Sequence, residues 1–114
     1  KDLRSRITLY EMSDVIKNAK LFIGIDSMPM HIAQAHNTPG VSFFGSIKPE
    51  LRIYRENMKS VTAPNLACLG CHHRQIAPVT SLKLCETKTL DCENLVTVEM
   101  MWKIIEEQLC NQSI

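Results

Sequence analysis

The stretch "LFIGIDSMPMHIAQAHNTPGVSFFG", residues 21–45, decides the fold. Its first five residues form an apolar run of strand length without alternation, which predicts a strand at 21–25 buried on both faces. "VSFFG", residues 41–45, predicts a second buried strand. Between them a helix is expected to start near Pro29, because proline suits the first helical turn, and "HNTPG" should end it. A strand, helix and strand at these short spacings predict a parallel sheet in an α/β fold.

Two other segments have helical periodicity. Thr8 and Glu11 have the spacing of a capping box, which predicts a helix over about 9–19. Thr97 is a candidate N-cap for a helix that starts with "VEMMWK" and docks on the sheet. The residues expected to face the core are Leu9, Met12, Val15, Ile16 and Ala19 in the first helix, Ile32, Ala33 and Ala35 in the helix after Pro29, and Val98, Met100, Met101, Trp102, Ile105 and Leu109 in the last.

The chain divides into three parts by pattern. Residues 1–60 carry the α/β pattern, 61–96 are cysteine-rich with little periodicity, and 97–114 hold the last helix. Two strands are too few for a stable sheet, so we expect further strands from residues outside this chain. The absence of an initiator Met agrees with that expectation of a fragment.

Composition excludes several classes of partner. Thirteen Lys and Arg face twelve Asp and Glu, so the formal charge is +1, and no nucleic acid or anionic surface is indicated. No apolar run approaches the roughly 20 residues needed to cross a bilayer, and the start "KDLRSR" lacks the apolar core of a signal peptide. We therefore expect no transmembrane segment and a cytosolic location.

Polar side chains gather where the first predicted strand gives way to a helix. Asp26, Ser27 and His31 lie at that junction, together with Pro29. An anion beyond the carboxyl end of a parallel strand can accept bonds from the N–H groups that open the next helix. Ser27 or Asp26 could cap the helix, and His31 lies about one turn inside it. The alternative is that Asp26 and Ser27 are ordinary caps and His31 is a surface residue.

A second candidate loop follows the second predicted strand. In "GSIKPELR", residues 45–52, Ser46 and Lys48 could contact the same ligand, with the lysine opposite a phosphate. The alternative for this loop is a solvated turn.

The cysteines suggest a metal site. Four of the five have the spacing C-x2-C-x13-C-x6-C, and "CLGC" resembles a metal knuckle in which Gly70 can adopt the turn. Four thiolates suit structural zinc, with iron as second choice. Free thiols or disulfides are the alternatives. The expected ligands are Cys68, Cys71, Cys85 and Cys92.

Other histidines and the fifth cysteine have simpler interpretations. His72 and His73 follow the knuckle and could replace a cysteine ligand, or be an exposed pair. Cys110 is expected to be an unpaired thiol. His36 is expected at the surface or as a cap.

The run "LYEMSDVIKNAKLFIGIDSMPMHIAQAHNTPGVSFFGSIKPE" resembles the C-terminal domain of the bacterial heptosyltransferase family, glycosyltransferase family 9. The resemblance covers residues 3–55 well and continues more weakly through the cysteines and 96–109. It implies part of a Rossmann-like parallel-sheet domain, the C-terminal half of a GT-B fold, with a cysteine-rich metal-binding insertion and a C-terminal helix. An N-terminal GT-B domain outside this chain would carry the acceptor site and the catalytic base, so no catalytic residue is assigned here.

By position, the resemblance puts Asp26, Ser27, Met28 and His31 on the turn that binds the donor, commonly ADP-heptose. Met28 stands where the family has glycine, and its side chain could narrow the pocket. The implied function is transfer of a sugar from a nucleotide diphosphate sugar to a lipopolysaccharide-like, lipid-linked or other glycan acceptor. It would take place in the cytoplasm, with peripheral attachment to the inner face of a bacterial membrane as an option. The alternative is a small zinc-binding protein-interaction module without catalysis.

Overall fold

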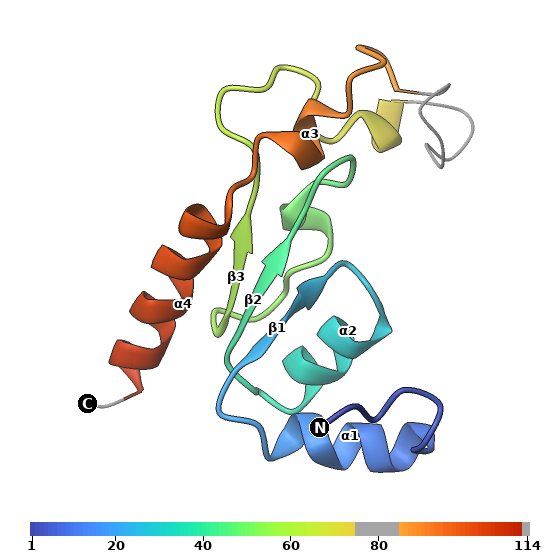
Figure 1. The fold of residues 1–114 in the computed structure, drawn as a ribbon, viewed down its shortest axis with the longest axis vertical. Coiled ribbons are helices and arrows are strands. Elements are labelled where there is room, and N and C mark those ends of the chain that lie inside the picture. Colours follow the sequence, from blue (N-terminus) through green and yellow to red (C-terminus); the bar gives the residue numbers. More distant parts are fainter. Residues whose placement is uncertain (75–84, 113–114) are drawn as a thin grey trace.

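The protein is described by a computed structural model that covers residues 1–74 and 85–112 (Figure 1). Its elements, in chain order, are α1 (Leu9–Lys17), β1 (Phe22–Ile25), α2 (Met28–Ala35), β2 (Gly40–Phe43), the 3-10 helix η1 (Pro49–Leu51), β3 (Met58–Val61), the 3-10 helix η2 (Cys71–Arg74), α3 (Asp91–Asn94) and α4 (Val98–Asn111). The α/β class expected from the sequence is confirmed.

In the part of the chain that the structure describes, three parallel strands form the sheet, in the order β1-β2-β3. Ile25 pairs with Phe43, and Phe43 pairs with Val61, so the three strands end side by side. The sequence predicted β1 and β2 but not β3, because Lys59 and Ser60 interrupt its apolar pattern and only its end residues are buried. The sheet therefore has one strand more than the sequence indicated.

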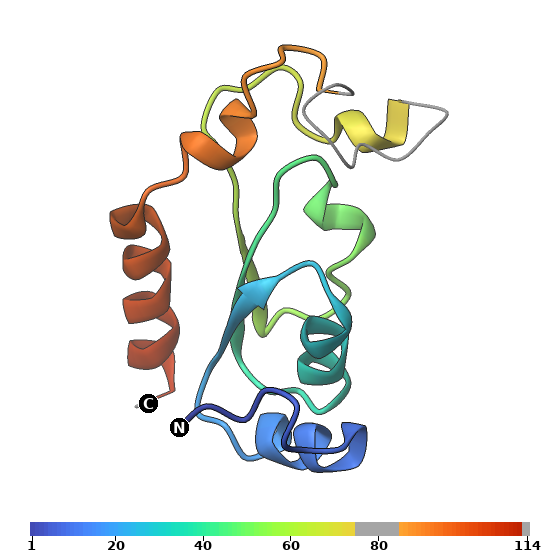
Figure 2. The ribbon, with the colours of Figure 1, turned by 45° about the vertical axis from the view of Figure 1, so that its right-hand side comes forward.

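Helices cover both faces of this sheet (Figures 1 and 2). On one face α2 packs against β1 and β2, with α1 behind it, while α4 packs against β2 and β3 on the other. The core on the α2 side is built from Ile16, Met30, Ala33, Phe44 and Met58, and the core on the α4 side from Val41, Val61 and Ile105. The division of the chain into residues 1–60, 61–96 and 97–114 stays a prediction. Helix α4, which belongs to the third part, packs into one core with the strands.

The capping box of α1 is confirmed. The Thr8 hydroxyl accepts a hydrogen bond from the Glu11 N–H, and the Glu11 carboxylate accepts one from the Thr8 N–H. This second bond, with the Thr8 hydroxyl, lowers the pKa of Glu11. The helix ends at Lys17 and is therefore shorter than the predicted 9–19. Leu9 and Val15, which were expected to face the core, are exposed.

The expectation that β1 is buried on both faces is wrong. Ile23 is 53% exposed and Ile25 is 58% exposed, while Phe22 packs against the core on the α2 side. In the described residues β1 pairs with β2 along one edge, and α4 lies over β2 and β3. The side of β1 that faces away from α2 is therefore left open.

The inward faces of α2 and α4 also differ from the sequence prediction. Helix α2 buries Met30 and Gln34 along with Ala33, whereas Ala35 is exposed. Helix α4 buries Ile105 and Gln108, with Met100, Met101 and Ile104 packed beside them. The side chains of α4 expected in the core but found exposed are Val98 at 78%, Trp102 at 55% and Leu109 at 38%.

A buried glutamine fixes the position of α4. The Gln108 side chain donates to the backbone oxygens of Gly40 (3.1 Å) and Asn57 (2.8 Å), at the amino ends of β2 and β3. Ile104 and Gln108 line a small hollow with Lys59 and Ser60 of β3. Trp102 lies on the opposite flank of α4 and is exposed.

Among the helices of the described ranges, none has the length and apolar character that a membrane crossing requires.

We predict that Ile105→Ala lowers the free energy of unfolding of the chain by about 2 to 5 kcal/mol, because it leaves a cavity between α4 and the sheet. The matched control is Ile23→Ala, which removes the same atoms from an exposed position and should cost about 0.5 kcal/mol or less. Urea unfolding of both variants measures the difference. Equal losses would show that α4 is not packed on the sheet.

Candidate functional site

The carboxyl ends of β1 and β2 lie next to each other and open onto a small crevice. Its volume is about 160 Å³, and its polar lining comes from Asp26, Ser46 and Glu93. Asp26 directly follows β1 and Ser46 belongs to the loop after β2, so the parallel register brings the two predicted turns together. This is the edge at which parallel α/β sheets bind ligands.

Asp26 is the centre of a charged cluster. Its side chain is 16% exposed, and its two oxygens face different partners. One lies 3.6 Å from Nε2 of His31, and the other lies 3.4 Å from Nε of Arg52. Asp26 therefore holds an imidazole and a guanidinium on either side of one carboxylate.

Sequence reasoning missed Arg52 and Tyr54. The Tyr54 ring stacks parallel to the His31 ring at 6.3 Å between centroids, and its hydroxyl donates to the His31 backbone oxygen. Gln34 holds the backbone of Arg52 and Tyr54. Its buried side chain donates to the Arg52 carbonyl (3.0 Å) and accepts from the Tyr54 N–H (2.8 Å). In the sequence, the indication of this arrangement was Gln34, a polar residue one turn after His31, which the structure shows to be buried.

Helix α2 begins beside this cluster without a side-chain cap. Ser27 occupies the N-cap position, but its hydroxyl donates to the Ile25 carbonyl at 3.3 Å, so the expected capping bond is not formed. Pro29 stands in the first turn and has no N–H. Met28 is 55% exposed and does not fill the crevice. The positive end of α2 is thus open to an anion.

Lys48 is turned toward a different hollow. With Ser60, Thr62 and Gly70 it lines a cavity of about 340 Å³ on the far side of the loop after β2. Its methylene stem crosses Gly70 so closely that a Cβ there would lie 2.4 Å from Cγ of Lys48. The structure thus brings Asp26, His31 and Ser46 to one edge and separates Lys48 from them.

The largest hollow among those described lies elsewhere. It has a volume of about 630 Å³ and is lined by Arg55, Asn57, Lys59 and Gln108. These residues lie at the amino ends of β2 and β3, away from Asp26. Ligands of parallel sheets bind at the carboxyl ends, so this hollow is the weaker candidate despite its size.

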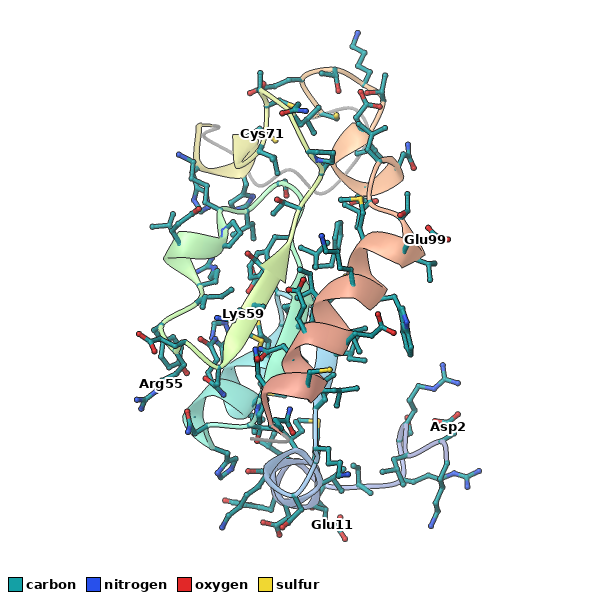
Figure 3. The ribbon with its side chains drawn as sticks, turned by 90° about the vertical axis from the view of Figure 1, so that its left-hand side faces the viewer. Asp2, Glu11, Arg55, Lys59, Cys71 and Glu99 are labelled. Atoms are coloured by element: carbon teal, nitrogen blue, oxygen red, sulfur yellow. The ribbon has the colours of Figure 1, made fainter. Side chains whose placement is uncertain are left out.

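The cysteine region lies beyond the carboxyl ends of the strands, and Figure 3 shows Cys71 at that end of the molecule. Cys71 and Cys85 are buried, and none of the five cysteines is in a disulfide. Burial raises the pKa of Cys92, and charges on Glu93 and on the other three thiols add to this effect. The hydroxyl of Thr87 and nearby N–H groups lower the pKa of Cys85 to about 7.

The structure does not bring three metal ligands to binding distance in the described ranges. In residues 1–74 and 85–112, no group of three or more His, Cys, Asp or Glu side chains is arranged to hold an ion. His73 uses Nε2 to accept a hydrogen bond from the Lys48 N–H. Cys110 is exposed on α4, and His36 is the exposed C-cap of α2, as expected.

A three-stranded parallel sheet between helices, with charged side chains at its carboxyl edge, defines an α/β domain or part of one. The chain belongs to a known family of this class. The sequence model of Glycosyltransferase family 9 (heptosyltransferase) matches residues 1–79, which include β1, α2, β2 and β3.

Two curated relatives are similar to shorter stretches. Lipopolysaccharide heptosyltransferase 3 of Escherichia coli is 50% identical over 44 residues, which are 39% of this chain and 13% of the relative. The protein of the same name from Escherichia coli strain K12 is 39% identical over 64 residues, 55% of this chain and 19% of the relative. The chain thus matches less than a fifth of either relative's length. No solved structure matches.

We predict that Gln34→Leu lowers the free energy of unfolding by about 1 to 3 kcal/mol, because the Arg52 carbonyl and the Tyr54 N–H lose their buried partner. The matched control, Gln112→Leu at the exposed end of α4, should be nearly neutral. Urea unfolding measures both, and hydrogen exchange should show a faster-exchanging Tyr54 amide in Gln34→Leu. An unchanged exchange rate of the Tyr54 amide would contradict the role of Gln34 in holding Tyr54.

Proposed function

We propose that this chain is the donor-binding part of a glycosyltransferase. The whole protein would move a heptose or similar sugar from a nucleotide diphosphate sugar to a lipopolysaccharide-like or other glycan acceptor. The observation that carries the proposal is the cluster in which Asp26 lies between His31 and Arg52, beside the uncapped start of α2. Family membership and the relatives' names support the same reaction class.

The cluster suits a diphosphate for electrostatic reasons. Arg52 offers several N–H donors in a planar fork, of which Asp26 engages the Nε side, at 3.4 Å. His31 is 42% exposed in its side chain, so its ring is accessible to a ligand. The start of α2 adds a positive partial charge through the helix dipole, although its Met30 and His31 N–H groups donate to the Ser27 carbonyl. Asp26, which lines the crevice, is then a positioning residue that holds the side chains of His31 and Arg52 beside it.

In the proposed reaction, the bond between the anomeric carbon and the diphosphate oxygen breaks, and a bond from that carbon to an acceptor hydroxyl oxygen forms. The nucleoside diphosphate leaves with the bonding electrons, and donors already aimed at its oxygens stabilise the charge that develops. The acceptor proton needs a general base, which we expect in the N-terminal GT-B domain. Arg52 and His31 therefore serve the leaving group.

The crevice is too small to hold the whole donor. At about 160 Å³ it falls below the roughly 300 to 1,000 Å³ of small-molecule sites. We propose that the rest of the protein completes it and packs on the open side of β1. That side exposes Ile23 and Ile25. An apolar strand edge of this kind is normally paired or covered.

The donor site is tested by calorimetry of the full-length protein with ADP, UDP and GDP. We predict that Arg52→Gln weakens binding of the preferred nucleotide about tenfold to a hundredfold, since it removes charge-assisted hydrogen bonds to phosphate. The matched control is Arg55→Gln, which removes an exposed arginine from the 630 Å³ hollow and should leave the affinity unchanged. Asp26→Asn should also weaken binding, because it releases both side chains.

Two results would contradict the proposal. If Arg55→Gln weakens binding and Arg52→Gln does not, the nucleotide binds at the amino ends of the strands. If a folded full-length protein binds none of the three nucleotides, the donor proposal fails and the zinc-binding interaction module gains support. A cytoplasmic location, with or without peripheral membrane attachment, stays a prediction.

The proposal that the rest of the protein packs on the open side of β1 can be tested separately. Ile23→Lys should lower the melting temperature of the full-length protein by several degrees, because it puts a charge into a covered apolar surface. The same substitution should change the isolated chain little, since Ile23 is exposed there. The control is Leu9→Lys, at a position with a similar exposed fraction of 52% on α1. Equal effects of Ile23→Lys in both proteins would show that nothing covers this strand.

A further inference from the structure

We propose that Cys68, Cys71, Cys85 and Cys92 bind one zinc ion, and that this ion fixes the loop at residues 45–48. The inference is independent of sugar transfer, because it concerns the thiols and the loop they contact. It assigns a structural metal site, with four thiolates and no open position for substrate.

The first pair of cysteines lies on a tight turn. The Cys71 N–H donates to the Cys68 carbonyl at 3.0 Å, and Gly70 between them has a φ of +75°, which favours glycine. The turn is tied to the loop after β2, since the His72 N–H donates to the Ser46 carbonyl at 3.0 Å. The first pair is thus held over residues 45–48.

Cys92 of the second pair lies against the same loop. Sγ of Cys92 lies so close to Gly45 that a Cβ added there would be 3.3 Å from the sulfur. The neighbouring Glu93 lines the crevice with Asp26 and Ser46. Figures 1 and 2 show η2 and α3 at the same end of the molecule, above the carboxyl ends of the strands. The thiol of Cys92 and the backbone of the turn that carries Cys68 and Cys71 therefore both contact the loop after β2.

The described residues around these cysteines bury few apolar side chains. Between Ala63 and Ile105, the buried hydrophobic side chains of the described residues are Cys71 and Cys85. The helices η2 and α3, which lie in the described part of this segment, have four residues each. A long connection with so little apolar burial needs another source of order, and a metal ion supplies one.

The structure does not bring the four thiols together as a formed metal site. No three of the described His, Cys, Asp or Glu side chains are arranged to hold an ion. Zinc binding to thiolates is coupled to local folding, so we expect the ion to draw the two pairs together. Thiolates favour zinc over harder ions such as magnesium or calcium. His73 already accepts the Lys48 N–H, which favours the fourth cysteine as ligand.

The site is tested on the full-length protein, purified under reducing conditions with zinc in the medium. Elemental analysis should find one zinc per chain from this site, and the four thiols should react slowly with a thiol reagent until a chelator removes the metal. Cys92→Ser should lose the zinc. The matched control, Cys110→Ser, changes an exposed cysteine on α4 and should keep it.

Wild-type protein provides a test that does not depend on the folding of a variant. Removing zinc with a chelator should speed hydrogen exchange at residues 45–48, and adding zinc back should slow it again. The proposal is overturned if the four thiols react freely in zinc-supplemented protein, if they form disulfides or bind iron, or if Cys92→Ser keeps its zinc. Unchanged exchange at residues 45–48 would overturn the structural role in the loop.

Discussion

The parallel pairing of β1 with β2 is the constraint on which the rest of the structure depends. Because Ile25 pairs with Phe43, the turn that carries Asp26 and the loop that carries Ser46 begin at the same level of the sheet. Strands that ran antiparallel would put these two segments at opposite edges. Burial of Phe44 and Val41 on the two faces of the sheet holds this register, since a slip by one residue would turn each to the wrong side.

Within that frame, one buried amide builds most of the candidate site. Gln34 bonds to the backbone of residues 52 and 54, and thereby keeps Arg52 beside Asp26 and the Tyr54 ring against His31. The charged groups themselves are partly exposed, and a lone exposed ion pair contributes little to stability. We therefore propose that these groups serve ligand recognition: the fold holds an imidazole and a guanidinium against Asp26, which lines the crevice beside the start of α2.

Sequence reasoning predicted the elements that depend on local pattern. The capping box at Thr8, the strands on either side of α2 and the clustering of Asp26 with His31 followed from spacing alone. What it missed depends on contacts between distant segments: β3 is recognisable only once β2 is beside it, and Arg52 reaches Asp26 only through Gln34. The same limit explains the errors at Trp102 and Ile23, whose apolar character predicted burial that the described part of the chain does not provide.

The most direct test of the account is where a nucleoside diphosphate binds. Amide chemical shifts of the isotope-labelled full-length protein, followed during titration with its preferred nucleotide, locate the contact residue by residue. The account predicts the largest changes at Ser27 and Met28, at the start of α2, and at the Nε–H of Arg52. Changes confined to the hollow around Asn57 and Lys59, with the start of α2 unaffected, would contradict it.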